Sequence, residues 1–159
     1  DALARLEEDV LARDPSTVIV LLGGNDLLRH IFEDVRDNPL LAGLRDDLEE
    51  AAENEGYEFE DVPLIPREET FANIEEIVER IQESGAEVVV VGLDLSPLSR
   101  SVDEQYAALA ARTGSALVPD IYDGVFGRRA LMSDLVHPND AGYDIFASRI
   151  APPVACLSE

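Results

Sequence analysis

Short apolar runs that alternate with longer helical patterns restrict the fold of this sequence more than any other feature. The apolar runs are Val18–Leu22, Val88–Val91 and Ala116–Val118. Runs without a polar residue are typical of strands that are buried on both faces of a parallel sheet. Helical spacing of apolar residues covers residues 2–13, 70–82, 102–112 and the stretch after Asn139. Strands and helices that alternate in this way predict right-handed crossovers and an α/β fold, a three-layer α/β/α sandwich with a parallel sheet.

Several residues mark where these helices begin and end. Proline disfavours a helical conformation in the residue before it, so we expect Asp14 to end the first helix. Thr70 and Asn139 are predicted to cap the helices that follow them, since their side chains can accept backbone N–H bonds. We expect Pro152 and Pro153 to end the last helix.

Residues 31–69 break the alternation of strands and helices. This stretch holds many acids, three prolines and an amphipathic pattern from Leu40 to Ala52. We interpret residues 1–159 as a single domain that carries an acidic insert at 31–69. The insert leaves the expected sheet next to Asn25 and Asp26, which favours a lid or a specificity element. A solvated surface excursion is an equally good interpretation.

The charge of the chain is extreme. Against 34 acids stand 12 bases, all of them arginine, which gives a net charge of −22. Such a surface repels itself in dilute buffer, whereas at about 1 M salt the screening length falls to about 3 Å. The composition therefore favours a salt-adapted, cytoplasmic protein over one from a merely acidic, arginine-biased proteome, and secretion is left open because the chain starts at Asp1. Nucleic acid is a poor partner for an acidic face, and no apolar run is long enough for a membrane span.

Cysteine and histidine are too scarce for a conventional metal site. Cys156 is the only cysteine, and His30 and His137 are the only histidines. An intrachain disulfide is therefore impossible, and a zinc site would depend on carboxylates that water solvates well. We interpret Cys156 as a small packed residue, and we expect no metal and no organic cofactor.

Polar side chains follow each expected strand. Asn25 and Asp26 come after the first strand, Asp94 and Ser96 after the second, and Asp134 and His137 after the third. The carboxyl ends of parallel strands share one edge of the sheet, where ligands bind in such folds. An acid three residues before a histidine can orient the imidazole as a general base, and a rigidly held asparagine amide can stabilise an oxyanion. The sequence thus predicts part of a hydrolase site at this edge.

Two segments resemble conserved blocks of a known family. Leu22–Arg29, which reads Leu-Gly-Gly-Asn-Asp-Leu-Leu-Arg, resembles the third block of the SGNH (GDSL-type) hydrolases in their arylesterase and lysophospholipase/thioesterase branch. Met132–Tyr143, with Asp-Leu-Val-His-Pro inside it, resembles the fifth block and the helix after it. Residues 74–92 are also similar to that branch, so the resemblance covers nearly the whole chain outside the insert.

The resemblance implies a role for several residues. His137 would be the general base and Asp134 its orienting partner. Asn25 would donate a hydrogen bond to the oxyanion, and Gly23 would allow the tight turn that presents it. Leu27 and Leu28 are expected to help form the wall of an acyl pocket, and the expected substrate is a small acyl ester or thioester.

The chain departs from the family pattern at its start. The family's first block, Gly-Asp-Ser, should supply the nucleophile and its second block an oxyanion glycine, but neither stands in this sequence. Without the first two strands of the family order 2-1-3-4-5, the remaining strands stay contiguous, and Val18–Leu22 becomes an exposed apolar edge. We therefore expect either a preceding segment or a homo-oligomer that forms through this edge. Ser96 and Ser133 could replace the missing serine, but we interpret both as turn residues.

The sequence leaves more than one function open. The first is a serine esterase whose His137 and Asp134 serve a serine outside these residues. The second is a non-catalytic SGNH-like domain or fragment that associates through its edge strand. A flavodoxin-like receiver is a third, since acids at strand ends can bind magnesium, but receivers need a lysine and this chain has none.

Overall fold

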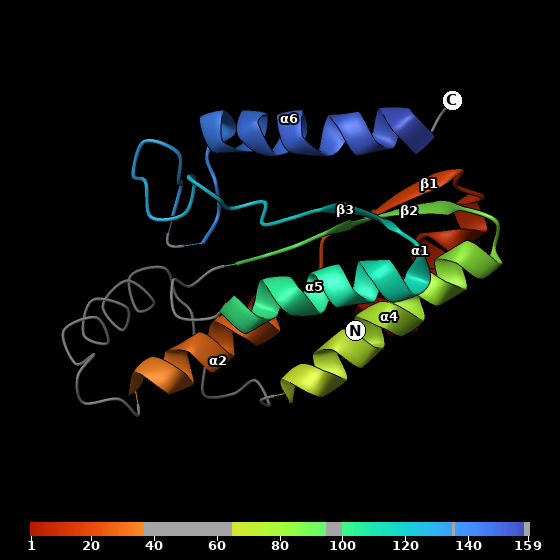
Figure 1. Ribbon diagram of the computed structural model, residues 1–159, viewed down its shortest axis with the longest axis horizontal. Coiled ribbons are helices and arrows are strands. Elements are labelled where there is room, and N and C mark those ends of the chain that lie inside the picture. The colour runs from red at the N-terminus through yellow and green to blue at the C-terminus, as the bar shows by residue number, and fades with distance from the viewer. Residues whose placement is uncertain (37–64, 95–99, 135, 158–159) are drawn as a thin grey trace.

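A computed structural model describes residues 1–36, 65–94, 100–134 and 136–157 of the chain (Figure 1). Its elements in chain order are α1 (Ala2–Asp9), the 3₁₀ helix η1 (Leu11–Arg13), β1 (Thr17–Val20), α2 (Gly24–Arg36), α4 (Arg67–Glu83), β2 (Glu87–Val91), α5 (Arg100–Thr113), β3 (Ala116–Val118) and α6 (Asp140–Leu157). Each described strand is followed by a helix, as the apolar pattern predicts, except that two helices, α2 and α4, lie between β1 and β2.

The three described strands form one parallel sheet in the order β1-β2-β3. Val20 lies opposite Val90, and Val91 lies opposite Val118. Among the described strands β1 pairs with β2 alone, so its other edge is free, as expected for Val18–Leu22. Ile19 lies in this edge strand and is 46% exposed. Leu21 lies one residue beyond it and is 41% exposed.

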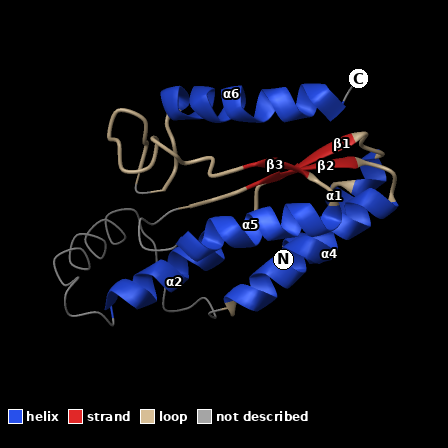
Figure 2. Ribbon diagram, in the orientation of Figure 1, coloured by secondary structure: helices blue, strands red, loops and turns tan. Residues whose placement is uncertain are grey.

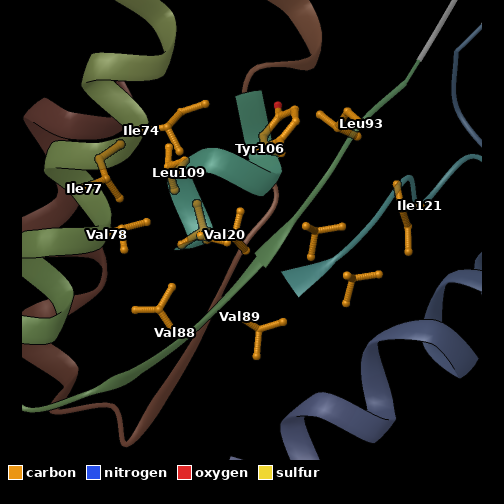
Figure 3. Close-up of a cluster of buried hydrophobic side chains, with 14 of the residues drawn as sticks. Val20, Ile74, Ile77, Val78, Val88, Val89, Leu93, Tyr106, Leu109 and Ile121 are labelled. Carbon is orange, nitrogen blue, oxygen red and sulfur yellow. The ribbon is translucent and has the colours of Figure 1, made fainter. Parts of the chain in front are cut away.

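Helices cover both faces of the sheet (Figure 2). Helix α6 lies on one face, whereas α4 and α5 lie on the other, and the three-layer α/β/α arrangement is confirmed. The core lies at the sheet, where Val88–Val91 of β2 are each at most 1% exposed. Side chains from α4 and α5 pack against these valines (Figure 3), and Val78 and Leu109 are completely buried. This core fixes the strand ends that carry the polar residues.

Two predicted helix boundaries are wrong. Thr70 does not cap α4, which begins at Arg67 after Pro66; the Thr70 side chain is instead buried, at 3% exposure. Pro152 and Pro153 do not end α6, because the helix continues through both to Leu157. Proline inside a helix costs about 3 kcal/mol. Val154 and Leu157 pack against the core beyond the prolines, and this burial offsets the cost.

Helix α2 occupies the chain after Gly23, where the sequence indicated only a turn followed by the insert. It runs over Gly24–Arg36 and therefore takes up the first residues of the predicted 31–69 insert. The predicted amphipathic segment from Leu40 to Ala52 lies outside the described residues. Whether the insert acts as a lid stays a prediction.

Candidate active site

Asp134 and His137 form a hydrogen-bonded pair in the loop between β3 and α6. The Nδ1 atom of His137 lies 2.7 Å from Oδ2 of Asp134. The other carboxylate oxygen, Oδ1, accepts the backbone N–H groups of His137 at 2.6 Å and Val136 at 2.9 Å. These bonds fix the imidazole relative to the carboxylate. Because Nδ1 faces the carboxylate, Nε2 is the nitrogen left for a substrate, and 54% of the His137 side chain is exposed.

Further hydrogen bonds hold the loop that carries this pair. The backbone N–H of Ser133 donates to the His137 carbonyl at 2.8 Å. The Ser133 hydroxyl donates to the carbonyl of Pro138 at 3.2 Å. The phenol of Tyr122 reaches across from the preceding turn and donates to the Val136 carbonyl at 2.7 Å. Ser133 is thus engaged with the backbone, in agreement with its interpretation as a turn residue.

The pKa of Asp134 lies below its usual range. Partial desolvation in the loop raises this pKa, but the hydrogen bonds from His137 and Val136 outweigh desolvation and lower it. The charge of a protonated His137 acts in the same direction. The carboxylate is therefore held ionised, as an orienting partner of a general base must be.

This lowered pKa has a consequence for stability against pH. A carboxyl group whose pKa is lower in the folded chain stabilises the fold above its unfolded pKa, and this contribution is lost as the pH falls through the folded pKa. We predict that Asp134→Asn lowers the free energy of unfolding at neutral pH and that the deficit shrinks below about pH 4. Urea unfolding of both proteins at matched pH measures the deficit. A deficit that stays constant down to about pH 3 would contradict the prediction.

Asn139 joins this loop to α6, as the sequence predicted for a cap. Its Oδ1 accepts the backbone N–H of Gly142 at 3.2 Å, and its Nδ2 donates to the Ala130 carbonyl at 3.0 Å. The backbone N–H of Asn139 also donates to the Leu131 carbonyl at 2.9 Å. The first turn of α6 therefore lies directly against the loop that carries His137.

Gly142 allows this close contact. A Cβ at Gly142 would overlap the carbonyl oxygen of Leu131 and lie 2.6 Å from Cβ of Pro138. Alanine is favoured over glycine in a helix by about 1 kcal/mol, so only this overlap can make the substitution unfavourable. We predict that Gly142→Ala lowers the free energy of unfolding by about 1–3 kcal/mol, measured by urea denaturation.

Gly24→Ala is the matched control. A Cβ at Gly24 would have Leu93 Cδ1 as its nearest neighbour at 3.7 Å, an ordinary contact. Because Gly24 begins α2, we expect this variant to leave the free energy of unfolding unchanged or to raise it by up to about 1 kcal/mol. Equal effects of the two substitutions would show that the overlap at Gly142 is relieved without cost.

Asn25 lies in the first turn of α2, just beyond the end of β1, and is exposed. Gly23 has a φ of +99°, a left-handed conformation that favours glycine, and it turns the chain from the strand into the helix. The backbone N–H of Leu27 donates to the Gly23 carbonyl at 2.9 Å and closes that turn. The tight turn expected at Gly23 is therefore present. The partial positive charge of a helix N-terminus also favours an anion beside Asn25.

Leu27 and Leu28 point into the protein. They are 3% and 5% exposed, and Leu27 belongs to the main hydrophobic core. Contact of these side chains with an acyl group stays a prediction. Their burial shows that they anchor the first turn of α2 to the core.

Parallel strands bring the predicted residues to one side of the sheet. The three strands run in the same direction, so the segments that follow them begin at the same edge of the sheet. The Asn25 turn and the loop with Asp134 and His137 therefore both follow this edge (Figure 1). Among the described residues no hydrogen bond links Asn25 to either of these two side chains. Ser96, predicted for this edge, lies outside the described residues.

Asp26 contacts a residue that is distant in the chain. Its Oδ2 accepts the hydroxyl of Thr70 at 3.3 Å. Thr70 belongs to α4, so this contact joins the Asn25 turn to the helix beneath it.

Asp120 is a residue that sequence reasoning missed at this edge. Its Oδ1 accepts the backbone N–H groups of Asp94 at 3.2 Å and Tyr122 at 3.0 Å. Desolvation raises the pKa of Asp120, and also that of neighbouring Asp103. Both line a cavity of about 570 Å³ that includes neither Asp134 nor His137. Asp120 lies two residues after β3, and this position at the end of a strand is the sequence feature that indicates it.

In the described parts of the chain, no group of three or more histidine, cysteine, aspartate or glutamate residues is arranged to hold a metal ion. No helix in this part of the chain combines the length and apolarity that crossing a membrane requires. Cys156, expected to be packed, is exposed.

Known structures share this fold. The chain matches TesA with a TM-score of 0.70 and 24% identity over 98% of this chain and 71% of that one. A catalytic mutant of Axe2, an acetylxylan esterase from Geobacillus stearothermophilus, gives 0.65 and 18% over 97% and 66%. A GDSL-like lipase from Bacteroides thetaiotaomicron gives 0.55 and 19% over 98% and 68%. At these identities the matches establish the fold alone.

A family model settles the family. No curated protein matches this sequence. Residues 1–145, however, match the model of the GDSL-like lipase/acylhydrolase family, and this range includes the Asn25 turn and the Asp134–His137 pair. The chain therefore belongs to the GDSL-like lipase/acylhydrolase family.

Proposed function

We propose that this protein hydrolyses acyl esters or thioesters through a Ser-His-Asp relay, in which His137 is the general base and Asp134 orients it. The observation that carries the proposal is the 2.7 Å bond between His137 Nδ1 and Asp134 Oδ2. Its serine would come from a segment outside these 159 residues. The family membership and the esterase among the structural neighbours support the same reaction class.

The proposed reaction has two halves. His137 Nε2 accepts the serine proton as the hydroxyl oxygen attacks the acyl carbonyl. The tetrahedral oxyanion then accepts a hydrogen bond from the Asn25 side-chain amide, with Gly23 shaping the turn that presents it. As the intermediate collapses, His137 protonates the leaving alcohol or thiol. Water then attacks the acyl-enzyme with His137 again as base, and His137 gives this proton to the serine oxygen as the carboxylic acid is released.

The acyl pocket is a further part of the proposal. The side chains of Leu27 and Leu28 are almost completely buried. They would contact an acyl chain only through the small exposed part that lies beside Asn25. The Gly-Gly-Asn-Asp turn resembles the arylesterase and lysophospholipase/thioesterase branch, and this resemblance supports the choice of substrate class. We therefore propose small acyl esters and thioesters as substrates, with no metal or organic cofactor in the relay.

Hydrolysis assays test this function. The natural protein in its full length, in about 1 M KCl, is given p-nitrophenyl acetate, p-nitrophenyl butyrate and an acyl thioester. We expect turnover of at least one of them and a large loss in Asp134→Asn. A folded full-length protein that hydrolyses none of these probes would sink the proposal.

A second candidate is a non-catalytic domain that self-associates through the edge of β1. The exposed Ile19 and Leu21 beside an unpaired strand edge favour this reading. An open apolar edge invites pairing with another strand. Light scattering at high salt should then show a dimer that Ile19→Arg converts to a monomer. A monomeric wild-type protein would remove this candidate.

We also propose that the protein works in a salty cytoplasm. The net charge of −22 destabilises the fold through self-repulsion unless salt screens it. We predict that the midpoint of thermal unfolding rises steadily between about 0.1 M and about 1 M KCl, where the screening length drops from about 10 Å to about 3 Å. Calorimetry at several KCl concentrations measures the midpoint. A midpoint that does not respond to KCl would contradict salt adaptation.

A further inference from the structure

Tyr106 of α5 contacts the turn that carries Asn25. Its hydroxyl donates to the carbonyl of Leu22, with 2.6 Å between the two oxygens. The side chain is 1% exposed and lies with Ile74 and Leu93 at one end of the core (Figure 3). An edge-on ring contact with Phe71, at 4.9 Å between centroids, fixes the ring from α4. Tyr106 therefore reaches the turn from a rigid, buried position.

The hydroxyl of Tyr106 also occupies the space beside Gly23. A Cβ at Gly23 would lie 2.7 Å from this oxygen, closer than carbon and oxygen approach without bonding. Burial, and to a smaller extent the charge of Asp26, raises the pKa of the Tyr106 hydroxyl. The group thus stays protonated and remains a hydrogen-bond donor. The Tyr106 hydroxyl therefore fits beside residue 23 only because that residue is a glycine.

A second hydroxyl holds the other side of the same turn. Thr70 Oγ1 donates to Asp26 Oδ2, whereas Tyr106 donates to Leu22. Asn25 lies between these two anchored residues and is itself exposed. Oxyanion donors contribute most when they are fixed before the reaction, so a buried anchor beneath the donor has a catalytic consequence.

We propose that Tyr106 is a positioning residue for the oxyanion donor: its bond to the Leu22 carbonyl holds the Gly23 turn in the conformation that presents Asn25. This inference rests on the proposed function for its catalytic part, and on the contact geometry for its structural part. Tyr106 touches neither substrate nor reacting atoms and acts through Asn25.

Amide hydrogen exchange, followed by NMR on the full-length protein, tests the structural part. In Tyr106→Phe the Leu27 amide, which bonds to the Gly23 carbonyl, should exchange about tenfold faster or more once global stability is matched with denaturant. Amides of β2 should not change under the same conditions. Tyr122→Phe is the matched control, since it removes a hydroxyl bond to the Val136 carbonyl instead. Unchanged Leu27 exchange in Tyr106→Phe overturns the inference.

A kinetic cycle on the full-length protein tests the catalytic part with p-nitrophenyl acetate. Tyr106→Phe should lower kcat about tenfold with little change in KM, and it should have no further effect in an Asn25→Ala background. If Asn25→Ala lowers kcat but Tyr106→Phe does not, or if the two effects multiply, the positioning role is wrong and the proposed function stands. If Asn25→Ala has no effect, the proposed oxyanion donor fails, and the catalytic role of Tyr106 fails with it.

Discussion

Replacing His137 with alanine should lower kcat/KM for ester hydrolysis by about 10⁴-fold in the full-length protein, the largest effect that we expect. The variant keeps the fold, because the His137 side chain is largely exposed and its backbone carries the loop's hydrogen bonds. It removes the only group in the proposed relay that can accept the serine proton. Steady-state hydrolysis of p-nitrophenyl acetate, with circular dichroism to confirm folding, measures the loss.

His30→Ala is the control for this experiment. His30 is the other histidine of the chain, and its Nε2 lies 2.8 Å from the carbonyl oxygen of Ile65, away from the Asp134 pair. We expect its kcat/KM to stay within about threefold of the wild-type value, a difference of less than 1 kcal/mol in transition-state stabilisation. Comparable losses in the two variants would mean that His137 has no special role.

Replacing Asn25 with alanine should lower kcat by about 10²- to 10³-fold, with a much smaller change in KM. The oxyanion exists only in the transition state and the intermediates, so the loss of its donor affects kcat and barely affects ground-state binding. The Asn25 side chain is exposed, and its removal should leave the stability of the fold nearly unchanged. Stopped-assay kinetics over a range of ester concentrations separate kcat from KM.

Asn25→Asp sharpens this test. Aspartate matches asparagine in shape, but its carboxylate only accepts hydrogen bonds and adds a negative charge. If Asn25 donates to an oxyanion, this variant should be at least as impaired as Asn25→Ala. An Asn25→Asp protein with nearly wild-type kcat would exclude a donor role for this side chain.

The sequence allowed much of the sheet to be predicted. The runs at Val18, Val88 and Ala116 became the parallel strands, and the Val88 run is buried on both faces, as a continuous apolar run predicts. The cap at Asn139 and the turn at Gly23 also follow local chemistry, a side-chain acceptor in one case and a left-handed φ in the other. These features depend on neighbours close in the chain.

Features set by distant contacts were not predictable. Thr70 looked like a cap, but its hydroxyl turns toward Asp26, 44 residues away. Tyr106 lies within the helical pattern of residues 102–112, and that pattern does not indicate that its hydroxyl bonds to Leu22, 84 residues away. The end predicted at Pro152 failed because packing of the last turn of α6 outweighs helix propensity. The spacing of residues in one sequence does not indicate such tertiary contacts.

For the candidate site, the pairing of Asp134 with His137 followed from their spacing of three residues, which the loop geometry confirms. The distance from this pair to Asn25 depends on how three strand ends are placed, and the spacing of residues does not give it. Asp120 was missed because a single acid after a short strand resembles an ordinary turn residue.

Labelling with a fluorophosphonate, a probe that reacts with activated serines, tests the central claim most directly. The folded full-length protein, in about 1 M KCl, is labelled beside His137→Ala, and the modified peptide is mapped by mass spectrometry. We predict one labelled serine that lies outside these 159 residues, and loss of the label in His137→Ala. A label on Ser96 or Ser133, a label that persists without His137, or no label at all would contradict a relay built on Asp134 and His137.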